Sequence, residues 1–193
     1  MTTRLPRIAF VSAAALLCAL ALGACGGGAK QPTAHGDSEG AYVQAGPLIY
    51  QVQLSRELNP FDIEDHEYLQ GLSAGATETA PDELLFGVWL RVQNATDQVH
   101  PAASEFAIVD TLGNRYDPIP LPASNPTAYT PRDVATDNGQ PLSPNPESVA
   151  GSGPIQGSML LFKLNTSVYS NRPLELEITP PEGGEPSTVD LDL

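Results

Sequence analysis

Apolar and polar positions alternate along several short segments of the chain, which is the pattern of a β-strand with one buried face. In residues 47–56, for example, Leu48, Tyr50, Val52 and Leu54 alternate with Gln51, Gln53 and Ser55. Comparable patterns occur in residues 83–94, 105–111, 157–165, 173–180 and 187–193. They predict about seven short antiparallel strands, each with one face toward water. No long segment shows the 3.6-residue period of an amphipathic helix.

Such strands close most naturally as two packed sheets, so we expect an all-β, immunoglobulin-like antiparallel β-sandwich. One short helix and a long proline-rich loop, residues 117–154, interrupt the strand pattern. Proline stiffens that loop, and we expect it to lie extended along the sandwich with Tyr129 holding it there. The core is expected to contain Phe86, Val88, Leu90, Phe106, Ile108, Leu160 and Phe162.

The N-terminal residues have the pattern of an export signal. Arg4 and Arg7 precede an apolar run, residues 8–24, which is nearly long enough to be an uncleaved membrane anchor. The run ends in Leu22-Gly23-Ala24-Cys25, which resembles the lipobox of bacterial lipoproteins. The alternative is an ordinary signal peptide with an incidental cysteine. We expect a signal peptide at 1–24, a lipidated Cys25 with a flexible glycine-rich tether at 25–41, and the sandwich domain at 42–193.

Cysteine content and charge narrow the functional classes. The two cysteines are Cys18, in the signal, and Cys25, so the mature chain would lack a free thiol and a disulfide. The formal net charge is −14 at pH 7, and loss of Arg4 and Arg7 makes it more negative. Such a surface repels nucleic acid and anionic lipid headgroups, keeps an exported protein soluble, and attracts cations or basic partners.

In an acidic stretch, residues 58–71, the residues at the expected ends are those typical of a short helix. Asn59 is suited to the N-cap and Pro60 to the first helical position, while Gly71 is suited to the position after the last turn. Leu58 and Ile63 are spaced as a hydrophobic staple. We therefore expect the apolar side chains of this stretch to hold the helix to the sandwich while its acids face water.

The same stretch supplies weak candidates for metal binding: Asp62, Asp65 and His66. Zinc would need a third ligand such as His100, and nothing in the sequence places one. The calcium-loop pattern fails, because Glu67 stands where glycine is required and Ser73 where glutamate is required. Binding of a divalent metal or small ligand by the acidic segment 57–83 remains the alternative function.

No catalytic motif emerges. His100 and Asp110 flank Ser104, but the segment is a loop entering a strand rather than a nucleophile elbow. The sequon Asn94-Ala95-Thr96 is read as a turn. We expect no enzyme activity and no cofactor.

The segments around residues 86–118 and 148–164 resemble the DUF4352-like, MPT63-type immunoglobulin-like domains of bacterial lipoproteins. The resemblance rests on Phe106, Ile108, Asp110, Gly113 and Tyr116 of a hairpin, and on Gly157 and Phe162 of a later strand. It implies an extracytoplasmic β-sandwich without an assigned reaction, and it supplies no catalytic residues.

The sequence therefore predicts a binding or accessory module, anchored by a lipid at Cys25 to the extracytoplasmic face of a membrane. The expected partners are that membrane, through the lipid, and a membrane or cell-envelope protein. Nucleic acid is not among the expected partners, given the acidic surface.

Overall fold

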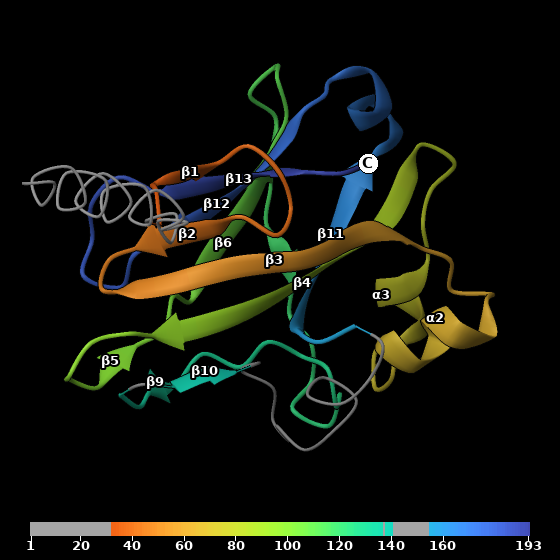
Figure 1. The fold of residues 1–193 in the computed structure, drawn as a ribbon. Coiled ribbons are helices and arrows are strands. Elements are labelled where there is room, and N and C mark those ends of the chain that lie inside the picture. Colours follow the sequence, from red (N-terminus) through yellow and green to blue (C-terminus); the bar gives the residue numbers. More distant parts are fainter. Residues whose placement is uncertain (1–31, 137, 141–154) are drawn as a thin grey trace, which may run out of the picture. The chain divides into compact units, whose positions relative to one another are not determined.

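Two β-sheets pack face to face in the computed structural model, which describes residues 32–136, 138–140 and 155–193 (Figure 1). The expected signal peptide and Cys25 lie outside the described residues. The first sheet has six strands, and β4 lies at its centre between β3 and β11. Its strands are β2 (Tyr42–Ala45), β3 (Leu48–Leu58), β4 (Glu83–Asn94), β11 (Ser158–Asn165), β8 (Pro118–Ile119) and β10 (Asn138–Gln140), the last pairing with β4.

The second sheet has five strands, and its pairings are antiparallel except for β1 with β13. In spatial order these are β1 (His35–Gly36), β13 (Ser187–Leu191), β12 (Leu174–Thr179), β6 (Glu105–Val109) and β7 (Arg115–Tyr116). A separate two-stranded pair joins β5 (His100–Pro101) to β9 (Asp133–Val134). The all-β sandwich expected from the alternation is therefore the fold of the described part of the chain.

The main core lies between the two sheets and is built from the inward members of each alternating strand. All seven residues predicted for the core are buried, with Phe86 and Phe162 facing each other across the β4–β11 pairing. Burial of a large apolar side chain contributes about 1.5–3 kcal/mol, so these inward rows are the main stabilising feature of the fold.

Strand β4 departs from the expectation of one wet face, because both of its faces are buried along most of its length. Leu85 and Trp89 point away from the main core into a second apolar cluster, which also contains Leu58, Leu69, Met159 and Leu161. The loops around α2 (Ile63–Tyr68) and α3 (Ala74–Thr77) cover this outer face. Gly87 leaves room for the Trp89 ring, since a Cβ there would lie 2.7 Å from Trp89 Cη2.

The helix of the acidic stretch begins later than the sequence predicts. Its N-cap is Asp62, whose side chain accepts a hydrogen bond from the Glu64 amide, while Asn59 Oδ1 accepts from the Phe61 amide in the preceding turn. The predicted staple is wrong, because Ile63 is 87% exposed while Leu58 ends β3 in the second cluster. Gly71 does adopt a positive φ of +81° just beyond the helix.

The predicted tether differs from the structure at its C-terminal end. The folded unit begins at Pro32 rather than at Tyr42. The Gln44 amide donates to Thr33 O at 2.8 Å, and β1 forms a parallel pair with β13. Gly36 permits this close packing, since a Cβ there would lie 2.9 Å from Ala41 and Val43. The small and polar side chains of this segment bury little apolar surface. Its backbone groups nevertheless form hydrogen bonds at the edges of both sheets.

The described part of the proline-rich segment lies along the sandwich as predicted. It contributes the short strands β8, β9 and β10, each paired with an element outside the segment. Tyr129 does hold it: its ring meets Phe106 edge-on at 5.1 Å between centroids, and its hydroxyl donates to Ala103 O at 2.8 Å. Residues 141–154 lie outside the described residues.

Two turns follow the predicted side-chain chemistry. Asn94 is fully buried, and its Oδ1 accepts hydrogen bonds from the Thr96 amide and hydroxyl, which confirms the turn reading of the sequon. Asp110 Oδ1 accepts from the amides of Leu112 and Asn114, and Gly113 has φ +80°. Among the described residues, no helix is long and apolar enough to cross a bilayer.

Candidate functional site

Residues 59–72, here called the acidic loop, do not assemble the predicted metal ligands. Asp62 is exposed and caps α2, whereas Asp65 is only 6% exposed and faces the sandwich. The two carboxylate oxygens of Asp65 accept hydrogen bonds from the Arg56 guanidinium and from the Asn59 amide, the latter at 2.8 Å. His66 is exposed. The carboxylate of Asp65 is thus occupied by hydrogen bonds within the fold. The expectation that all acids of this stretch face water is therefore wrong for Asp65.

Arg56 holds Asp65 from the adjacent end of β3. Its guanidinium carbon lies 5.6 Å from the Trp89 ring centroid and 5.9 Å from that of Tyr68, within the range of cation–π attraction. Tyr68 and Trp89 themselves meet edge-on at 5.0 Å between centroids. Burial raises the pKa of Asp65, but the hydrogen bonds from Arg56 and Asn59 outweigh it and hold that pKa below its ordinary value.

A second clamp fixes the far end of the acidic loop. Asn125, which is fully buried, donates from Nδ2 to Tyr68 O at 2.7 Å and to Gln70 O at 3.1 Å. Its Oδ1 accepts from the amide and hydroxyl of Thr127. The acidic loop is therefore held to the body of the sandwich at Asp65 and again at Tyr68 and Gln70.

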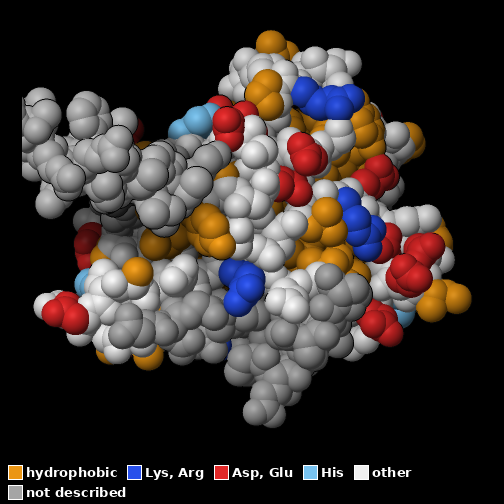
Figure 2. Space-filling model, in the orientation of Figure 1, with side chains coloured by type: hydrophobic (Ala, Val, Ile, Leu, Met, Phe, Trp, Pro, Cys, Tyr) orange, Lys and Arg blue, Asp and Glu red, His pale blue; other side chains and the backbone are white. Residues whose placement is uncertain are grey.

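This fixed loop presents two large apolar side chains to solvent. Phe61 is 94% exposed and Ile63 is 87% exposed. Exposed acids surround them: Asp62, Glu64 and Glu67. Figure 2 shows apolar side chains projecting among acidic ones at the edge where Figure 1 places α2. Phe61 also borders a surface hollow of about 600 Å³ that Leu69, Leu72 and Ala74 help to line.

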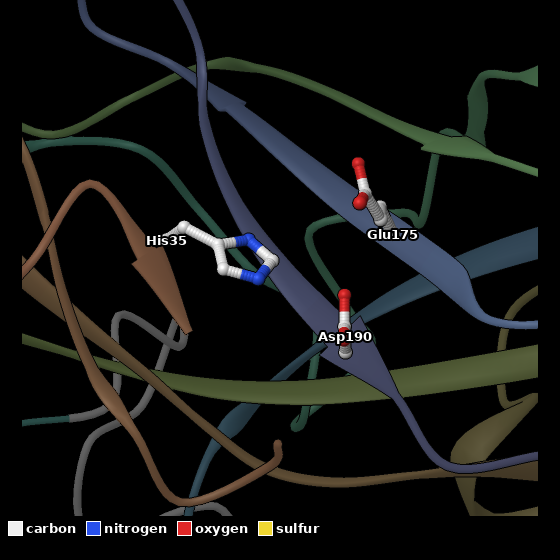
Figure 3. Close-up of side chains that lie close together, drawn as sticks. All are labelled: His35, Glu175 and Asp190. Atoms are coloured by element: carbon white, nitrogen blue, oxygen red, sulfur yellow. The ribbon is translucent and has the colours of Figure 1, made fainter. Parts of the chain in front are cut away.

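A second group of side chains with ligand atoms lies on the outer face of the five-stranded sheet. His35 comes from β1, Glu175 from β12 and Asp190 from β13, and Figure 3 shows the imidazole ring pointing toward the two carboxylates. One ligand atom from each lies within 4.8 Å of the others. One imidazole nitrogen and two carboxylate oxygens are ligand types of zinc and other divalent transition metals.

The sequence did not reveal this group, because its members are separated by up to 155 positions along the chain. Glu175 and Asp190 were recognised only as outward members of alternating strands. The pairing register places them directly opposite each other. Alternation predicts which face of the sheet each side chain occupies, but by itself it does not predict which outward residues of two strands are paired.

The Ser-His-Asp arrangement considered in the sequence is not supported by the contacts of its members. The carboxylate of Asp110 accepts hydrogen bonds from Asn114 and Asn171 in addition to the turn amides. Burial raises the pKa of Asp110, yet these hydrogen bonds keep it below its ordinary value. His100 Nδ1 lies 4.0 Å from Glu182 Oε1. Both side chains therefore have other partners.

A hollow of about 720 Å³ lies beside the ends of β3 and β13. Its polar groups mostly bond to one another: the Tyr169 hydroxyl donates to Glu57 Oε2 at 2.5 Å, and Arg172 Nε donates to Tyr169 O at 3.1 Å. Because these groups already satisfy each other, the hollow offers a ligand few unpaired polar contacts.

Comparisons with known proteins add one structural likeness. No family model matches the chain, and no curated protein matches it. Among solved structures, an uncharacterized β-sandwich protein from Clostridium difficile 630 matches with a TM-score of 0.37 and 8% sequence identity. The match covers 85% of this chain and 98% of that one.

Proposed function

We propose that this chain is a lipid-anchored, extracytoplasmic accessory protein without catalytic activity, and that its acidic loop, residues 59–72, docks a partner protein. The observation that carries the proposal is the near-complete exposure of Phe61 and Ile63 on a loop that Arg56 and Asn125 hold in place. Exposed aromatic and aliphatic side chains cost hydration free energy in the free protein, which binding would recover.

Fixation of the loop is what makes these side chains suitable anchors. Interfaces gain most of their affinity from a few side chains, aromatic ones prominent among them, that enter pockets on the partner. Ordering a flexible loop on binding costs affinity, and the Arg56–Asp65 and Asn125 contacts have ordered this one in advance. The acidic loop is thus pre-organised to insert Phe61 and Ile63.

The acids around these anchors select the chemistry of the partner. Asp62, Glu64 and Glu67 favour an apolar pocket whose rim carries lysine or arginine. They disfavour insertion into a bilayer with anionic headgroups, and they disfavour nucleic acid. A membrane or cell-envelope protein of basic surface therefore suits the loop better than a lipid surface does.

The anchor at Cys25 and the family resemblance belong to the same proposal. The lipobox-like Leu22-Gly23-Ala24-Cys25 that follows the apolar run supports lipidation, and with it a position at the extracytoplasmic face of a membrane. In the hairpin that carries the resemblance to DUF4352-like, MPT63-type domains, Asp110 accepts a hydrogen bond from the Leu112 amide and Gly113 has a positive φ, which is compatible with that resemblance. Metal binding by segment 57–83 is less well supported, because Asp65 is engaged by Arg56.

The test is site-specific photo-crosslinking in cells that make the full chain. A photoreactive phenylalanine analogue in place of Phe61 should give a discrete protein adduct. The matched control is the same analogue at Leu112, which is 74% exposed at the tip of the β6–β7 hairpin and should give none. Mass spectrometry then identifies the crosslinked protein.

Binding of that purified partner to the full chain in detergent completes the test. Phe61→Ser and Ile63→Ser should each weaken binding at least about tenfold, as expected for anchor residues. Leu112→Ser should leave it unchanged, and added salt should weaken binding to the wild type. Adducts to lipid alone, or equal adducts from positions 61 and 112, would contradict the proposal.

A further inference from the structure

We propose that His35, Glu175 and Asp190 bind a divalent transition-metal ion of the zinc class, at a site separate from the acidic loop. The three residues come from three adjacent strands of one sheet, in the order β1, β13, β12. Their ligand atoms lie within 4.8 Å of one another on the outer face (Figure 3). The proposal rests on this placement and on two further observations: the two carboxylates are paired across strands, and one oxygen of Asp190 is buried without a hydrogen bond.

The strand register sets the two carboxylates against each other. Glu175 and Asp190 are direct partners in the antiparallel β12–β13 ladder. Like charges directly opposite each other in a sheet are destabilising. The next outward acid on β12, Glu177, pairs with Arg115 from β7. Within the described residues, no comparable ion pair is formed by Glu175 or Asp190.

Asp190 has a buried oxygen without a partner. Its Oδ1 atom is shielded from solvent, and no hydrogen bond reaches it within the described part of the chain. An unpaired buried acceptor costs free energy, and a carboxylate costs more than a neutral group. A cation bound between Asp190, Glu175 and His35 would remove both this penalty and the cross-strand repulsion.

His35 is oriented as metal-binding histidines usually are. Its Nδ1 lies 2.8 Å from Thr188 Oγ1, and Thr188 is on the same face of β13 as Asp190. When the Nδ1 proton is donated to this hydroxyl, Nε2 carries the lone pair that a metal needs. Figure 3 shows both ring nitrogens on the side that faces the carboxylates.

The ligand set indicates which metal would be preferred. Zinc binds histidine nitrogen and carboxylate oxygen in sites with three protein ligands and an open position for water. Calcium and magnesium favour sets made entirely of oxygen, with calcium taking six to eight such ligands. The exposure of His35 leaves room for water to complete the coordination of zinc.

Metal binding would also fasten the edge of the sheet. Strand β1 joins β13 through only two residue pairs, His35 with Thr188 and Gly36 with Val189. A metal held by His35 on one side and by β12 and β13 on the other would crosslink three strands. The ion would then hold β1 to the rest of its sheet.

The test uses the full chain in detergent, with a histidine-free affinity tag and prior removal of metal by a chelator. Titration calorimetry with Zn²⁺ should show one saturable site per chain, and Zn²⁺ should raise the melting temperature by mass action. Ca²⁺ at the same concentration should not. Absence of saturable Zn²⁺ binding would overturn the proposal.

Three variants locate the site. His35→Ala and Asp190→Asn should each weaken Zn²⁺ binding at least tenfold, whereas His66→Ala, which removes an exposed histidine beside acids elsewhere, should not change it. Asp190→Asn should also raise the melting temperature without metal, because it removes the repulsion from Glu175. Retained affinity in His35→Ala, or loss in His66→Ala, would place the ion elsewhere and refute this site.

Discussion

At the level of single residues, Asp65 is the acid whose environment differs most from what its sequence neighbours suggest. It lies among exposed acids, yet it is buried against Arg56 and the Asn59 amide. Its folded-state pKa is lowered, so the native protein holds the Asp65 proton less tightly than the unfolded chain does. The stabilisation is present above the unfolded value of about 3.9 and is lost as pH falls through the lower folded value.

We predict that Asp65→Asn lowers the free energy of unfolding at pH 7 by about 1.5–3 kcal/mol, the usual range for hydrogen bonds to charged groups. Urea denaturation measures this loss. The variant should also lose less stability than the wild type between pH 5 and pH 2, because the group that titrates there has been removed.

Asp62→Asn is the matched control, since it makes the same change in the same loop at an exposed position. Asparagine caps helices as well as aspartate does, so only the helix-dipole contribution of about 0.3–1 kcal/mol should be lost. Equal losses in the two variants would mean that the Arg56–Asp65 contact contributes nothing beyond surface charge.

At the level of elements, the β4–β11 pair lies within the first sheet and supplies inward side chains to the main core. Its register places Phe162 opposite Phe86, and both side chains are fully buried in the main core. Each of the two strands was predicted from its apolar residues, but their pairing was not. The burial of the outer face of β4 was not predicted either. Trp89 on that face is covered by loops, and the position of these loops depends on the tertiary fold.

Phe162→Ala should destabilise the protein by about 3–5 kcal/mol, since it leaves a cavity as well as removing apolar contacts. The midpoint of denaturant unfolding should fall accordingly. Leu112→Ala removes an exposed side chain and should change stability by no more than about 0.5 kcal/mol. A loss below about 1 kcal/mol for Phe162→Ala would be inconsistent with the register described for β11.

At the level of the whole molecule, the proposed anchor, docking loop and metal site would divide the chain among three tasks. Lipid at Cys25 would hold the protein to the membrane, and the metal would fasten β1 to β12 and β13. The acidic loop would meet the partner from the opposite sheet, because Arg56 and Trp89 fix it to β3 and β4. Each proposed task depends on different residues, so a substitution can abolish one of them without affecting the other two.

The anchor itself is tested by Cys25→Ser. The variant should accumulate as unlipidated precursor, because the thiol that receives the lipid is absent. Intact-mass analysis of the membrane fraction would distinguish it from a lipidated wild type cut before Cys25. A wild-type chain without lipid, processed at another residue, would contradict the lipobox reading.

The sequence by itself determined the local features of this fold. Period-two alternation assigned Phe86, Phe106 and Phe162 to the core, because successive side chains of a strand point to opposite faces. Asn94 and Asp110 fixed their turns through bonds to amides two residues away. These outcomes depend on near neighbours in the chain, and so they can be read from it.

Only the tertiary structure decided what the local pattern leaves open. It brought Asp65 to Arg56, exposed Phe61 and Ile63, and aligned His35 with Glu175 and Asp190. It also placed residues 32–41 in the folded unit. Backbone hydrogen bonds hold these residues there, and their small and polar side chains give no sign of such bonds in the sequence. These contacts join residues far apart in sequence, and their geometry follows from strand register and packing across the whole domain.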